Sequence, residues 1–132
     1  MRRLEPDEVL IAEKLVQEHG DRFKAGHPGH GEIKDFTWYL VDCMAVSEIA
    51  LGTEEDWSTW MKKEMERAAA EGVPDRYKTF LESDPKGWDP TVIVEGTDSR
   101  FYVWVGHHRV GAAVFRAIPM IDALVGLRRP KP

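Results

Sequence analysis

Apolar residues alternate between two spacings in the first 49 residues. From Pro6 to Gly20 they recur every three or four positions, which predicts a short amphipathic helix. Residues 24–31 carry three Gly and one Pro and should form an irregular loop. Residues 36–49 are rich in aromatic and β-branched side chains, which favours extended structure, with a buried helix as the alternative for part of the run. We place a strand at residues 44–49.

A second helical pattern follows. Thr53 is an N-cap residue, and the acids after it suit the positive end of a helix dipole. The helix should run to about Ala70, before Gly72 and Pro74 end it, and residues 75–81 should add another turn or two. Its apolar residues predict a face that packs in the core: Trp57, Trp60, Met61, Met65 and Ala68.

From residue 90 onward the pattern changes again. Residues 91–95 and 100–105 are compact apolar runs separated by a turn, so they predict a β-hairpin. Gly106 follows the second strand, and helical spacing then continues until Pro119. Residues 120–125 predict a final strand. The order strand, strand, helix, strand indicates an α+β domain.

The composition fits one domain with one core. The chain has 132 residues and a mass of 15.1 kDa, and 42% of its residues are hydrophobic. The polar residues after Pro6 exclude a signal-peptide core, and no stretch approaches the roughly 20 apolar residues that a membrane helix needs. The single cysteine, Cys43, is compatible with a reducing compartment, and we expect it to be packed within residues 39–46. A cytoplasmic protein without membrane contact is the expectation.

Charge is divided unevenly along the chain. The net charge of −5 argues against broad, nonspecific attachment to nucleic acid. Residues 91–132, however, contain six Lys or Arg against three acids. An anionic ligand is therefore expected at the C-terminal end.

The residues Gly106-His107-His108-Arg109 have the chemistry of an anion-binding turn. A glycine between a strand and a helix allows a tight turn and a close approach of ligand to backbone. The first helical turn then offers unpaired amide hydrogens, to which Arg109 adds a forked cationic donor. A solvated arginine at a helix start is the plainer explanation.

Residues 90–125, with Val-Trp-Val-Gly-His-His-Arg-Val-Gly-Ala-Ala at their centre, resemble the shared core of ParB N-terminal domains, sulfiredoxins and free-serine kinases. The resemblance extends more weakly through residues 44–49 and the helix from Thr53. It implies a ParB/sulfiredoxin-like single domain over residues 1–132, with a small mixed sheet, a β-hairpin, a Gly-His-His-Arg turn and packed helices. Residues 1–35 would be an N-terminal helical extension and loop, and residues 44–126 the family core.

The resemblance implies a nucleotide, ATP or another, with its phosphates at Gly106, His107, His108 and Arg109 and with Mg²⁺ as a candidate companion. Some small proteins that resemble this fold are plasmid-borne fertility-inhibition factors or plasmid- or phage-type ParB-like nucleases, which hydrolyse ATP or cut DNA. This chain departs from sulfiredoxins in having His107 where they place the catalytic cysteine, so sulfiredoxin activity is not expected. It also lacks the added helix-turn-helix and dimerisation tail of partition ParB proteins.

Two functions remain open at this point. In the first, the chain is an ATPase or nuclease, with Glu48 and His107 as candidate catalytic residues; a solvent-facing acid is the plainer account of Glu48. In the second, it is a non-catalytic binding or inhibitory module that docks on a protein or DNA partner through exposed tryptophans, for which the candidates are Trp38, Trp57 and Trp60. His27 and His30 are candidate metal ligands in the glycine-rich loop. The further candidates Cys43, His19 and Glu32 do not lie at a recognised ligand spacing, so no metal site is predicted.

Overall fold

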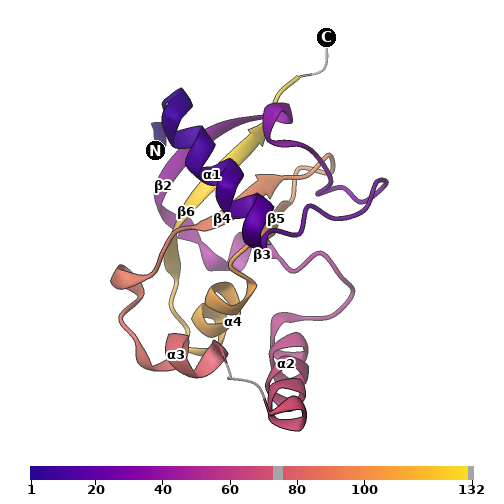
Figure 1. Ribbon diagram of the computed structural model, residues 1–132, viewed down its shortest axis with the longest axis vertical. Helices are drawn as coiled ribbons and strands as arrows, with labels where there is room; N and C mark the ends of the chain where they lie inside the picture. Colours follow the sequence, from indigo (N-terminus) through magenta and orange to yellow (C-terminus); the bar gives the residue numbers. More distant parts are fainter. Residues whose placement is uncertain (73–75, 131–132) are drawn as a thin grey trace.

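The computed structural model describes residues 1–72 and 76–130, which form one six-stranded mixed sheet with helices on its two faces (Figure 1). Three short 3₁₀ turns, η1 (Ile33–Asp35), η2 (Val46–Glu48) and η3 (Pro85–Gly87), connect its elements. The strands and helices are β1 (Arg2–Arg3), α1 (Pro6–His19), β2 (Phe36–Ala45), β3 (Ile49–Ala50), α2 (Trp57–Glu71), α3 (Arg76–Glu82), β4 (Thr91–Glu95), β5 (Phe101–Val105), α4 (His107–Phe115) and β6 (Met120–Arg128).

The strands lie in the order β1-β2-β6-β4-β5-β3. β4 and β5 form the predicted antiparallel hairpin, with Val94 opposite Tyr102. β6 enters between β4, to which it is parallel, and β2, to which it is antiparallel over nearly the full length of both strands. β1 and β3 are two-residue strands at the two edges. The loop at the end of β5 leads directly into α4.

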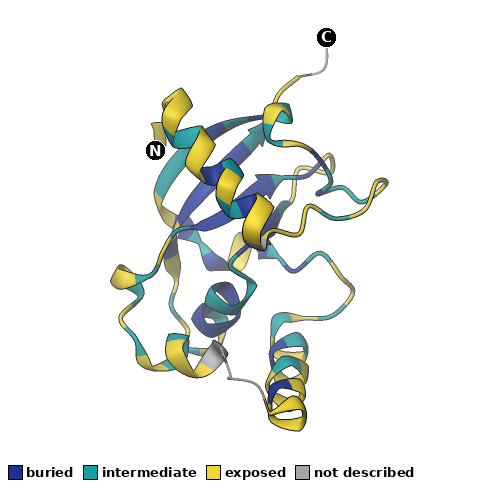
Figure 2. Ribbon diagram, viewed as in Figure 1, coloured by how far each residue is buried: buried dark blue, intermediate teal, exposed yellow. Residues whose placement is uncertain are grey.

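The side chains of β4 alternate between two cores, as the pleat of a strand requires. Val92 and Val94 belong to the core beneath α1, together with Ala12 and Val16 of that helix. Ile93 belongs to the core on the opposite face, which Val110 and Ala113 of α4 close. Because both faces are covered, the first four residues of β4 are buried, and residues 92–94 form a continuous apolar run (Figure 2).

Several predicted elements are confirmed: the first helix, the irregular loop, the hairpin and the helix after Gly106. The extended structure expected within residues 36–49 is confirmed at residues 36–45 and 49, and the strand placed at residues 44–49 is wrong at residues 46–48. The long strand is β2, which ends at Ala45, and residues 46–48 form the η2 turn, in which Glu48 is exposed. The amide of Val46 donates to Pro119 O at 3.0 Å, so the chain leaves the β2–β6 ladder there.

The N-cap of α2 is Asp56, so the prediction that Thr53 is the N-cap is wrong. The carboxylate of Asp56 accepts the amide hydrogen of Thr59 at 2.7 Å, whereas Thr53 Oγ1 accepts that of Glu55 within the preceding loop. Gly72 ends the helix in the left-handed conformation, as expected. Both Thr53 and Asp56 are good caps, and the loop geometry decides between them.

Two side-chain predictions are also wrong. Cys43 is exposed at the bulge where the β2–β6 register shifts, so it is not a packed apolar residue. Trp38 is buried in the core beneath α1, where its Nε1–H donates to Ile33 O at 3.0 Å, and it cannot serve as a docking residue. Within residues 1–72 and 76–130, no helix combines the length and apolar content that a membrane crossing would need.

The glycine-rich loop is fastened to the sheet by Arg128. Its Nη2 donates to Pro28 O and His30 O, each at 3.1 Å, its Nε donates to Glu95 O at 3.2 Å, and its guanidinium lies 4.7 Å from the Phe36 ring centroid. Arg128, the last residue of β6, therefore holds the loop in place.

Candidate anion-binding site

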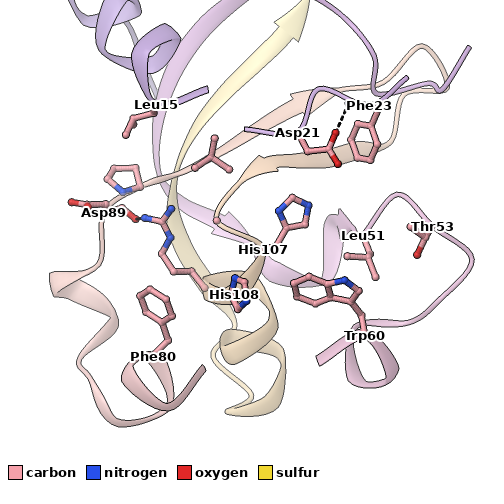
Figure 3. A pocket seen from close by; sticks show the side chains of 14 residues that line it. Leu15, Asp21, Phe23, Leu51, Thr53, Trp60, Phe80, Asp89, His107 and His108 are labelled. Atoms are coloured by element: carbon pink, nitrogen blue, oxygen red, sulfur yellow. Dashed lines mark hydrogen bonds between the residues drawn. The ribbon is translucent and has the colours of Figure 1, made fainter. Parts of the chain in front are cut away.

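A hollow of about 620 Å³ opens at the N-terminus of α4, and the predicted turn forms its floor (Figure 3). The other walls come from segments far apart in the sequence. Lining residues are Leu15, Asp21, Phe23, Leu51, Thr53, Trp60, Phe80, Asp89, Pro90, Val105, Gly106, His107, His108 and Arg109. The structure thus brings together all four residues of the predicted phosphate turn.

Gly106 gives the turn its shape. Its φ of +103° lies in the left-handed region, which a residue with a Cβ rarely adopts. The first hydrogen bond of α4 runs from the amide of Val110 to Gly106 O at 3.1 Å. The amides of the three preceding residues, 107 to 109, have no intrahelical acceptor and stand at the positive end of the helix dipole.

The guanidinium of Arg109 folds back over Gly106. A Cβ added to Gly106 would lie 3.0 Å from Nη2 and 3.1 Å from Nε of Arg109, which shows how closely the two residues pack. Nη1 donates to Asp89 O at 2.7 Å. Burial lowers the pKa of Arg109, although a guanidinium stays charged at neutral pH. Within the described ranges, no ion pair to this cation is found.

The two histidines differ in their surroundings. Burial lowers the pKa of His107, and the charges of Asp21 and Glu64 oppose that effect. His108 Nε2 lies 3.8 Å from Glu64 Oε2. Trp60 of α2 lies against both rings, with centroid distances of 5.7 Å to His107 and 5.5 Å to His108. Both imidazoles line the hollow, and their contact with a phosphate stays a prediction.

Asp21 is the lining residue that sequence reasoning missed most completely. Its amide donates to Trp104 O at 2.9 Å, two residues before Gly106, which fixes its backbone beside the end of β5. Its Oδ1 accepts the amide hydrogen of Phe23 at 2.9 Å. No local signal marks Asp21, because its relation to the turn is created by the path of the loop after α1.

The other candidate residues lie elsewhere. Glu48 is exposed in η2 and does not line the hollow. His27 Nε2 is 2.8 Å from Gly52 O, and His30 Nδ1 is 2.9 Å from Phe23 O, so both rings hydrogen-bond to backbone. Across the described part of the chain, no group of three or more His, Cys, Asp or Glu residues is arranged to hold a metal ion.

The structure is similar to the crystal structure of sulfiredoxin from Arabidopsis thaliana, with a TM-score of 0.34 and 18% sequence identity over 70% of this chain and 86% of that chain. No protein-family model and no curated protein matches the sequence. The predicted α+β architecture is confirmed, with its mixed sheet, its β-hairpin and the helix that follows Gly106.

Proposed function

We propose that this protein binds a nucleotide, with phosphate oxygens accepting hydrogen bonds from the amides of residues 107 to 109 and from the Arg109 guanidinium. One observation carries the proposal: a partly buried arginine, without an ion pair among the described residues, is held over the start of a helix inside a hollow. Burial of a cation is costly unless an anion compensates it, and phosphate suits a guanidinium fork.

The size and lining of the hollow suit a nucleotide. Pockets for small molecules are commonly about 300–1,000 Å³, and the volume here is about 620 Å³. Leu15, Phe80 and Trp60 offer apolar surface next to the phosphate turn, where a base or ribose would be shielded from water. The same hollow thus gives the ligand both a cationic anchor for its phosphates and an apolar contact.

The proposal concerns binding and does not extend to hydrolysis. ATP hydrolysis or DNA cleavage needs a group that orients water or a hydroxyl. Of the two predicted catalytic residues, Glu48 lies outside the hollow and His107 lines it. Nucleotide binding, without a claim of catalysis, is therefore the function that we propose.

Calorimetry of the purified protein against ATP, CTP and ADP, with and without Mg²⁺, tests the proposal together with Arg109→Ala. Charge-assisted hydrogen bonds are typically worth about 1.5–3 kcal/mol, so the variant should lose affinity roughly 10- to 150-fold. Arg109→Lys should recover part of the loss, because lysine keeps the charge without the fork. Arg100→Ala, at the exposed hairpin end, is the matched control.

The competing account is structural. In that account Arg109 serves only to hold the segment before β4 through its hydrogen bond to Asp89 O. Arg109→Ala would then lower the melting temperature and leave the affinity of the folded protein unchanged. That result would remove the phosphate site.

A further inference from the structure

The charges around the hollow do not favour a free polyphosphate. Its charged lining residues are one arginine, Arg109, and two aspartates, Asp21 and Asp89. Burial lowers the pKa of His107, so this residue adds no full cation at neutral pH. A nucleoside triphosphate would thus enter surroundings with an excess of negative charge, where an additional cation is needed to balance its phosphates.

The two aspartates are placed differently. Asp89 belongs to the surroundings of Arg109: its carbonyl accepts Nη1, and its charge raises the pKa of Arg109 against the effect of burial. Asp21 lies on the other side of the turn, near His107 and Phe23 (Figure 3). Among the residues that the structure describes, Asp21 has no ion-pair partner.

The carboxylate of Asp21 is held in a fixed position. The amide bond to Trp104 O fixes its backbone to the strand that leads into Gly106, and the Phe23 amide orients Oδ1. The residue is exposed, so waters can reach the oxygens of its carboxylate. A positioned, solvent-exposed carboxylate beside the proposed phosphate turn is the kind of ligand that Mg²⁺ takes, since this ion commonly combines one or two carboxylates with phosphate oxygens and several waters.

We infer that Asp21 is the protein ligand for a Mg²⁺ ion carried by the bound nucleotide, and that it makes the site select the metal complex over the free nucleotide. The inference rests on the proposed nucleotide binding. Bound Mg²⁺ neutralises phosphate charge. In its absence the carboxylate of Asp21 repels the same phosphates, so this one residue weakens binding of the free nucleotide and strengthens binding of the complex.

The test is the ratio of ATP affinities in excess Mg²⁺ and in EDTA, measured by calorimetry for three proteins. The wild type should bind about tenfold more tightly with Mg²⁺, which corresponds to about 1.4 kcal/mol. In Asp21→Asn the ratio should fall to about one, because metal-free binding improves and metal-dependent binding weakens. Asn keeps an oxygen that can accept from Phe23, and Asp21→Ser keeps a weaker acceptor should the first variant misfold.

Asp89→Asn is the matched control, since it removes the other carboxylate of the hollow. Its affinity should rise with and without Mg²⁺ alike, because Arg109 loses a competing charge, and the ratio should stay near that of the wild type. Water-proton relaxation with Mn²⁺ and ATP gives a second readout. It should report a ternary complex for the wild type and Asp89→Asn and lose it for Asp21→Asn.

The outcomes separate the two ideas. An Asp21→Asn protein that keeps the tenfold ratio and the ternary complex would overturn the role of Asp21, as would a wild type that binds ATP through Arg109 with no Mg²⁺ effect. In both cases the proposed nucleotide binding would stand. A wild type that binds no nucleotide under either condition would overturn both.

Discussion

Replacement of Gly106 by alanine tests the geometry of the turn directly. The new Cβ would lie 2.6 Å from Thr91 Cγ2, a distance that real Cβ atoms essentially never show. Thr91 is only 1% exposed and begins a central strand, so it cannot move away easily. The residue would also have to keep a φ of +103°. The strain therefore has a steric and a conformational part.

The two parts give a substantial loss of stability. A non-glycine residue in the left-handed region costs about 1–2 kcal/mol, and an additional methyl group in a packed region costs about 1–3 kcal/mol. The free energy of unfolding should thus fall by roughly 2–5 kcal/mol. For a domain of this size, at about 3–5 °C per kcal/mol, the melting temperature should fall by roughly 6 °C or more.

Urea and thermal denaturation measure the effect, with Gly72→Ala as the control. Gly72 has a φ of +68°, and a Cβ there would meet nothing within 4 Å, so that variant carries the conformational cost alone. Gly106→Ala should exceed it by the steric part, about 1–3 kcal/mol. Equal losses in the two variants would refute the close packing of Gly106 against Thr91 and Arg109.

Two further predictions concern titration and packing. The free energy of unfolding should fall as the pH drops below about 6.5, because burial lowers the pKa of folded His107 below that ordinary value and the unfolded chain then binds more protons. In urea denaturation, His107→Asn should therefore flatten the dependence of the unfolding free energy on pH between pH 5 and 7. If that dependence is the same in the variant and the wild type, His107 is not its source. Arg128→Lys should lower the free energy of unfolding by about 2 kcal/mol, because lysine cannot reproduce the guanidinium bonds to Pro28, His30 and Glu95. The same change at exposed Arg100 should stay within about 0.5 kcal/mol, and equal effects at both arginines would count against the packing role.

The sequence was most informative where structure is local. The hairpin and α4 follow from apolar runs, a turn and Gly106, all within one stretch of chain. The error at residues 44–49 has a different origin. β2 is a run of aromatic and apolar residues without clear alternation, so its ends depend on pairing with β6 more than 70 residues later. Such pairing leaves no mark in the local pattern.

The candidate site divides in the same way. Gly106 to Arg109 are neighbours in sequence, so the sequence alone shows their combination. Asp21, Trp60 and Asp89 reach the hollow from a loop, a helix and the segment before β4. Only the fold determines that these residues meet, and nothing about an isolated Asp after a helix end distinguishes it from an ordinary surface acid. The sequence therefore predicts Arg109, the cation of the candidate site, and does not predict its two aspartates, Asp21 and Asp89.

The central position of β6 also has a consequence for folding on the ribosome. The β4–β5 hairpin and α4 can form as soon as they emerge, because their contacts are local. β2 is synthesised much earlier, yet its long ladder partner is β6, which emerges only after α4. Until then the nascent chain carries an aromatic strand, with Phe36 and Trp38, whose edge is unpaired along most of its length. This interval is when the protein is most exposed to aggregation, and when a chaperone that shields apolar strands would help it most.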